Sequence, residues 1–142
     1  MNLTRVVLAA VGAFVAYFVL GGLFASVPAF RSEFRNYPSV YRSMDSMKSV
    51  MPIGMAAMFV AILALAVLYA GMVHGGPGLV SGLVQGLRFG SLVGVFAIGS
   101  FVVHNYVNLN IGGKLTLQQS VAYFVEWVVV GMVIGLIYRP PS

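Results

Sequence analysis

The sequence has no cysteine and few charged residues, and these absences exclude whole classes of protein. Of its 142 residues, 8% are charged and only 3 are Asp or Glu. A soluble domain carries about 25% charged residues, so the charges here are too few to cover a surface in contact with water. The lack of cysteine excludes disulfides, thiolate metal sites and cysteine nucleophiles.

The sequence also lacks the motifs that mark common enzymes. It contains no H-E-x-x-H metal motif, no G-x-S-x-G nucleophile elbow, no Walker loop and no set of paired carboxylates. The broken helices and inverted repeats of many transporters are not evident either. We therefore expect no catalytic residue and no metal site, and we favour a protein without enzymatic activity.

Long apolar runs dominate what is present. Hydrophobic residues make up 60% of the chain, and its mean hydropathy is +0.96. A helix needs roughly 20 apolar residues to cross a bilayer, and four runs approach that length. We predict an all-α fold, an integral membrane four-transmembrane-helix bundle that forms one domain over residues 1–142. Its helices are expected at about 5–27, 51–73, 77–108 and 117–138. The first run is longer than the 7–15 apolar residues of a signal peptide, so we expect a membrane helix there.

The longest connection, between the first two helices, carries an amphipathic pattern. Apolar side chains recur at helical spacing and charged ones occupy the other faces: Val40, Met44, Met47 and Met51 against Arg42, Asp45 and Lys48. The pattern favours a short interfacial amphipathic helix in the headgroup region, and a solvated loop is the alternative.

Local signals also predict where three helices begin. Pro52 suits the first turn of the second helix, and Pro77 can begin the third. Thr116 and Gln119 can form a reciprocal capping box at the start of the fourth.

Five glycines recur at a strict spacing of four in the third helix: Gly78, Gly82, Gly86, Gly90 and Gly94. Each costs roughly 1 kcal/mol against alanine in a helix interior, so the row needs a physical reason. In lipid, helices associate through close van der Waals contact, which small residues permit. We predict a glycine zipper, a groove along the third helix that receives another helix at a crossing angle near −40°.

Two other helices carry rows of small residues. Gly131 and Gly135 lie four apart in the fourth helix. In the second, alternating steps of three and four connect Gly54, Ala57, Ala61, Ala64, Leu68 and Gly71. The glycine groove can be filled within the chain by the first, second or fourth helix, or partly by a second copy or a subunit of a larger complex. Three such faces exceed the internal surface of four helices, so we expect one to be left over for a partner.

Glu126 is the only acid inside a predicted membrane helix, and an ionisable residue there is a functional candidate. Gln119 and Tyr123 share its face of the fourth helix. His104 and Asn108 lie four apart near the end of the third helix, where a contact between His104 and Glu126 is feasible. Two interpretations remain open. One is a polar pocket that binds a small polar molecule or relays a proton. The other is a neutral hydrogen-bonded clasp in which Glu126 stays protonated.

Histidine offers little for a cofactor. His74 and His104 end different helices on opposite sides of the membrane, so they cannot ligate one haem within a single chain. Axial ligation of a chlorophyll-type pigment by His104 stays open, and otherwise we expect no cofactor.

The net charge of +5 comes from scattered basic residues next to the apolar runs. We expect the headgroups of the lipid bilayer, and not nucleic acid, to be their partner. Lys and Arg number 3 on the side of the termini (Arg5, Arg88, Arg139) and 5 on the other (Arg31, Arg35, Arg42, Lys48, Lys114). Because cytoplasmic loops carry the excess, we expect a multi-pass protein of the cell (inner) membrane with both termini outside the cytoplasm.

The stretches "VLGGLFASVPAF" and "GMVIGLIYRP", together with the glycine row, resemble uncharacterised small four-helix bacterial integral membrane proteins, known as domains of unknown function. This resemblance spans most of the chain, implies a four-helix bundle and transfers no catalytic residue. Our first hypothesis is a helix-packing accessory or scaffold subunit of a membrane complex, or a self-associating module. The alternative is a small-solute or proton-coupled carrier that uses Glu126 and His104.

Overall fold

The computed structural model describes residues 1–73 and 78–139, and these residues form helices without any strand. Four helices are long and apolar enough to cross a membrane, which confirms the all-α expectation. They are α1 (Leu3–Ser26), α3 (Met44–Met72), a composite helix and α6 (Gly113–Ile137). The composite helix runs from α4 (Leu79–Ala97) through the π-helical η1 (Ile98–Val103) into α5 (His104–Asn108), and the short α2 (Pro28–Arg35) follows α1.

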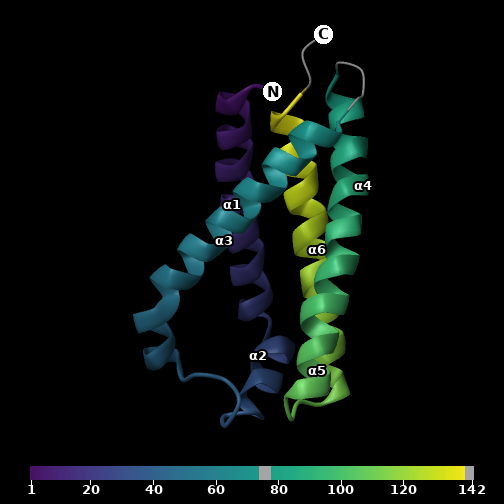
Figure 1. Ribbon diagram of the computed structural model, residues 1–142. Coiled ribbons are helices and arrows are strands. Elements are labelled where there is room, and N and C mark those ends of the chain that lie inside the picture. Colours follow the sequence, from purple (N-terminus) through teal and green to yellow (C-terminus); the bar gives the residue numbers. More distant parts are fainter. Residues whose placement is uncertain (74–77, 140–142) are drawn as a thin grey trace.

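Three of the long helices stand side by side and the fourth crosses them. In Figure 1, α1, α6 and the composite helix run nearly parallel to one another, with both termini at one end. Helix α3 crosses the other helices obliquely near that end and then leads away from them. The short helices α2 and α5 lie at the end opposite the start of α1.

The contact between α4 and α6 is a contact of backbones. Gly82, Gly86, Gly90 and Gly94 are the buried residues of α4. A Cβ on Gly90 would lie 2.5 Å from the carbonyl oxygen of Trp127, and one on Gly94 would lie 3.0 Å from the ring of Phe124. Because no side chain can occupy this space, the two helices approach as closely as their backbones allow.

The glycines of α6 complete this contact from the other side. A Cβ on Gly131 would lie 2.5 Å from the carbonyl oxygen of Gly86, and one on Gly135 would overlap the carbonyl oxygen of Gly82. The row on α4 is therefore filled within the chain, by the fourth of the expected helices.

Gly78 does not belong to this row. It precedes α4, has a φ of +148°, and a Cβ there would meet nothing within 4 Å. Helix α4 begins one residue later, so the glycine serves a backbone conformation that other residues rarely adopt, and it makes no helix contact. Pro77, expected to begin this helix, lies outside the described residues.

Helix α3 joins the bundle through its C-terminal half alone. Its buried residues, Ile62, Ala66 and Tyr69, pack against a core that α1 and α6 supply. From α1, Ala9, Ala10 and Ala13 are fully buried there, so α1 also lies close to α6. Upstream of Ala61, no described side chain of α3 is fully buried.

The start of α3 differs from the expected one. Ser43 caps the helix, its hydroxyl accepting a hydrogen bond from the Ser46 N–H at 3.3 Å, and Pro52 lies inside it. The expectation that Pro52 opens this helix is wrong, because the helix capped by Ser43 begins at Met44, eight residues before Pro52. The separate amphipathic helix is not confirmed: residues 44–51 are the first turns of α3, and Val40 precedes them.

The start of α6 also differs. The helix begins at Gly113, ahead of the expected 117, and the Thr116 hydroxyl donates to the carbonyl oxygen of Gly112 at 3.1 Å. Thr116 is thus already inside the helix, and it forms no capping box with Gln119.

We predict that Gly86→Ala destabilises the fold by about 1–3 kcal/mol, the usual cost of overpacking. Its Cβ would overlap the Gly131 carbonyl oxygen and come within 2.9 Å of the Cα of Met132, so α4 and α6 must separate. Unfolding in mixed micelles of rising denaturing-detergent content measures the change. The matched control is Gly22→Ala in α1, where a Cβ meets nothing within 4 Å. It should gain roughly 0.5–1 kcal/mol. Equal stability of both variants would contradict the backbone contact.

Candidate functional site

Glu126 lies at mid-height in α6, 13 residues after Gly113 and 11 before Ile137. It is 6% exposed and faces α1, because a Cβ on Gly21 would lie 3.4 Å from its Oε1. The missing side chain at Gly21 leaves room for the carboxyl group. Within the described part of the chain, Glu126 has no salt bridge and no hydrogen bond.

Two tyrosines interact electrostatically with this carboxyl group. Tyr17 of α1 and Tyr123, one turn before Glu126 in α6, lie within electrostatic range of it and of each other. The ring of Tyr17 also packs against Trp127, with ring centroids 5.5 Å apart. Sequence reasoning identified Tyr123 through its spacing and missed Tyr17, whose place depends on how α1 packs against α6.

A line of polar groups leads from this carboxyl toward the end of the bundle formed by α2 and α5. Tyr123 lies within electrostatic range of Tyr41, which belongs to the connection before α3. The side-chain amide of Gln119 donates to the Tyr41 hydroxyl at 3.1 Å. The expected common face of Gln119, Tyr123 and Glu126 thus continues to a residue of another segment.

His104 and Asn108 are not part of this group. The glycine contacts place the level of Glu126 between Gly90, which faces Trp127, and Gly94, which faces Phe124. His104 lies ten residues beyond Gly94, about 15 Å along the helix at 1.5 Å per residue. Both His104 and Asn108 are exposed, and the Asn108 amide donates to the His104 carbonyl oxygen at 2.7 Å. The feasible contact between His104 and Glu126 is therefore not formed.

A second polar cluster caps the same end, and sequence reasoning did not foresee it. The buried Glu33 of α2 forms an ion pair with Lys114 in the first turn of α6. The Gly112 N–H donates to the Tyr37 hydroxyl at 2.9 Å. These contacts fasten α2 and the 36–43 connection to the start of α6, and no local spacing signals them, because Glu33 and Lys114 are 81 residues apart.

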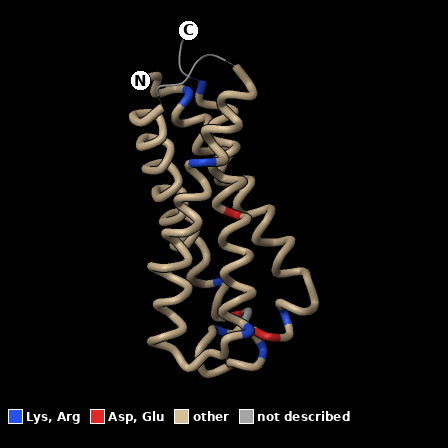
Figure 2. The backbone as a smooth tube through the Cα atoms, turned by 90° about the vertical axis from the view of Figure 1, so that its right-hand side faces the viewer, with Lys and Arg blue, Asp and Glu red and all other residues tan. Residues whose placement is uncertain are grey.

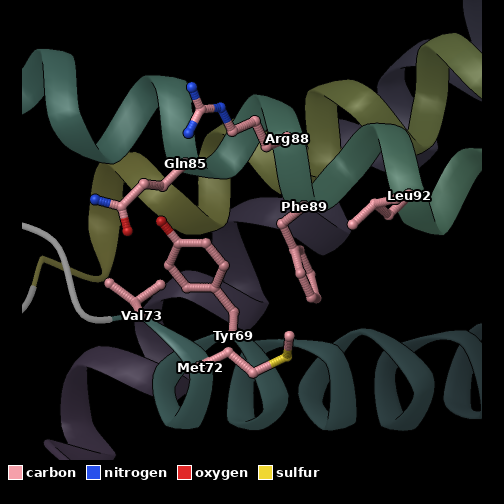
Figure 3. Close-up of a pocket in the computed structure, with 7 residues that line it drawn as sticks. All are labelled: Tyr69, Met72, Val73, Gln85, Arg88, Phe89 and Leu92. Carbon is pink, nitrogen blue, oxygen red and sulfur yellow. The ribbon is translucent and has the colours of Figure 1, made fainter.

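Two hollows flank α3. The larger, an open cleft of about 470 Å³, separates it from α4, η1 and α6 and is mostly apolar. Trp127 lines it, and the indole Nε1 of that residue is buried without a hydrogen-bond partner. The smaller, about 200 Å³, lies between the end of α3 and α4. In Figure 3, Tyr69 and Gln85 point toward one another there, whereas Arg88 points away.

The chemistry available around Glu126 is that of one carboxyl group and the phenols of Tyr17 and Tyr123. The described residues include no group of three His, Cys, Asp or Glu placed to hold a metal ion. Figure 2 shows most charged residues near the ends of the bundle, mostly at the end opposite the start of α1, with a basic and an acidic segment between the ends. A buried carboxylate without a cation is costly in a bilayer, and no ion pair joins a described cation to Glu126.

We predict that Lys114→Met destabilises the fold by about 1–2 kcal/mol, because it leaves the buried Glu33 carboxylate without its cation. The cost stays modest because the Lys114 side chain is 71% exposed. Thermal unfolding in mild detergent measures it. The matched control is Lys48→Met, whose partner Asp45 is 93% exposed and whose loss should change stability by less than about 0.5 kcal/mol. Equal effects would show that the Glu33 pair contributes no more than a surface pair.

No family model matches the chain, and no curated protein or solved structure is significantly similar to it. Arguments about function therefore rest on the geometry of α3 and of the Glu126 group.

Proposed function

We propose that this chain is an assembly module of a membrane, which binds another membrane helix through α3. The partner is a second copy of the chain or a subunit of a larger complex. The observation that carries the proposal is the exposure of the small-residue row on α3. Its small residues are all exposed, and so is the larger Leu68 that occupies one step of the row: Gly54, Ala57, Ala61, Ala64 and Gly71.

Small residues on an exposed face of a membrane helix allow another helix to approach its backbone closely. Lipid tails are as apolar as leucine, so close approach between helices, and not burial as such, favours association. A Cβ on Gly54 or on Gly71 would meet nothing within 4 Å, so this face is open over more than four turns. The steps of three and four along the row suit a left-handed crossing near +20°.

The other two small-residue faces are not available to a partner. Helix α4 uses Gly82, Gly86 and Gly90 against α6, and α6 uses Gly131 and Gly135 in return. Of the three faces, that of α3 is left over. Ala61 and Ala64 also line the open cleft, so a partner helix on the row would lie at its margin.

The distribution of Lys and Arg supports one orientation of the chain in the membrane. We propose the cell membrane as its location, with both termini outside the cytoplasm. The bias of 5 basic residues against 3 supports this orientation. The first turns of α3, with Asp45 and Lys48 exposed, then lie in the cytoplasmic headgroup region.

We predict that the double variant Ala57→Leu with Ala61→Leu weakens association by about tenfold or more, since added side chains hold helix backbones apart. Association is measured by energy transfer between labelled chains in vesicles and by co-purification in mild detergent. The control is Val60→Leu, 63% exposed on the same helix but outside the row. A wild-type chain that stays monomeric without co-purifying subunits would contradict the assembly function.

A second candidate function, proton-coupled carriage of a small solute, is favoured by the buried and unpaired Glu126. Tyr17 and Tyr123 interact electrostatically with this carboxyl group. A carboxyl group that takes up a proton becomes neutral, so it can line the path of a solute inside the membrane at low cost.

Under this second function, we predict that Glu126→Gln abolishes uptake driven by a pH gradient while preserving the fold, because an amide is a neutral isostere that cannot exchange a proton. Uptake of labelled amino acids, sugars and organic acids into vesicles loaded at a different pH measures the effect. Uptake that is driven by the gradient and survives in the variant would assign transport to another group. No uptake by the wild type would contradict carriage of these solutes.

A further inference from the structure

We infer that the Glu126 carboxyl exchanges its proton with one side of the membrane only, the side of the 36–43 connection. The route is the line formed by Tyr123, Gln119 and Tyr41. This inference goes beyond the assembly function. It requires that Glu126 bind and release a proton, and it does not require a solute to move.

The Glu126 carboxyl group is buried, but its oxygen atoms are not completely enclosed. Glu126 makes no hydrogen bond to any residue that the structure describes, yet its oxygens are not among the fully enclosed unpaired atoms, which include the indole Nε1 of Trp127. The absent side chain at Gly21 leaves space beside Oε1. A proton can therefore reach this group without rupture of an existing bond.

The polar line leads to one end of the bundle. Tyr123 precedes Glu126 by three residues and follows Gln119 by four, so the three share a helix face. Gln119 is hydrogen bonded to Tyr41 at 3.1 Å, and Tyr123 is within electrostatic range of both Tyr41 and Glu126. Tyr41 is half-buried beside the exposed Arg42, so the line ends at the bundle surface.

Toward the termini the same helix contact is filled with apolar groups. Val130 and Ile134 are buried, and a Cβ on Gly12 would lie 2.6 Å from Cδ1 of Ile137. On this side of Glu126 lie Tyr17, whose ring packs against Trp127, and, further along, the buried Tyr138. Beyond Tyr17, α1 and α6 close on each other, which makes the access one-sided.

The other ionisable groups near α6 do not compete for this role. From α3, Tyr69 packs at the level of Gly82 and Gly135. From α4, Arg88 is exposed, and from α2, Glu33 is paired with Lys114. No described cation reaches Glu126, so the proton is its partner.

The test uses the full chain in sealed vesicles of phosphatidylcholine and phosphatidylglycerol. Both lysines, Lys48 and Lys114, lie at the Tyr41 end and are exposed, so an impermeant amine reagent reports which end faces outward. Dicyclohexylcarbodiimide, which dissolves in the bilayer, adds to a protonated carboxyl, and the adduct rearranges to a stable N-acylurea without a leaving group. Mass spectrometry then follows labelling of Glu126 while the pH is set separately on each side.

We expect the labelling rate to follow the pH on the lysine side and to ignore the pH on the other. Tyr123→Phe should slow the response to a pH step by about tenfold, the order expected for one lost hydrogen-bonding group, and Tyr41→Phe should act likewise. The matched control is Tyr69→Phe, which removes a buried hydroxyl at the level of Gly82 and Gly135 on the closed side and should leave the response unchanged.

Three results would overturn the inference: labelling that follows the pH of the terminal side, labelling that follows both sides equally, or no labelling of Glu126 at any pH. Glu126→Gln, which must lose the adduct at this position, verifies the assignment. A monomeric chain, or one that takes up no solute, would contradict the proposed functions and leave this measurement unaffected.

Discussion

The contact of α4 with α6 at the level of their backbones is the constraint on which the rest of the structure depends. In hydrocarbon, apolar side chains gain little by leaving lipid for protein, so two helices stay together where their surfaces meet most closely. Gly86 and Gly131 make this close contact possible, because a Cβ on either one would overlap the carbonyl oxygen of the other. This pair sets the register of α6, and through α6 it sets what α1 and α3 can contact.

Helix α6 is the centre of the bundle, and its faces are divided between partners. Of the 18 most apolar consecutive residues of α6, 39% are buried, against 11% in the corresponding stretch of α3. One face meets α4 through glycine, and another turns Glu126 toward α1, where Gly21 makes room. Glycine thus has two roles around α6. It allows close backbone contact with α4, and at Gly21 of α1 it leaves room for the buried Glu126 carboxyl group.

The position of α3 follows from what the other helices leave free. With α1 and α4 already against α6, only Ile62, Ala66 and Tyr69 of α3 find a buried place. Its remaining length leaves the bundle with a row of small residues facing outward (Figure 1). An incompletely packed helix of this kind is what an assembly module needs, because a partner gains contacts there without displacing any that exist.

The sequence by itself determined the class of this protein and its four long helices, since hydrophobic length and composition are local properties that no partner alters. It also identified Glu126, because a lone acid in an apolar run is visible without a structure. Only the tertiary structure decided that α6 fills the glycine row, that Tyr17 and not His104 stands beside Glu126, and that Lys114 pairs with Glu33. Those outcomes depend on the register and rotation of one helix against another. Contacts between residues far apart in the chain set both, and helical spacing within a single segment cannot reveal them.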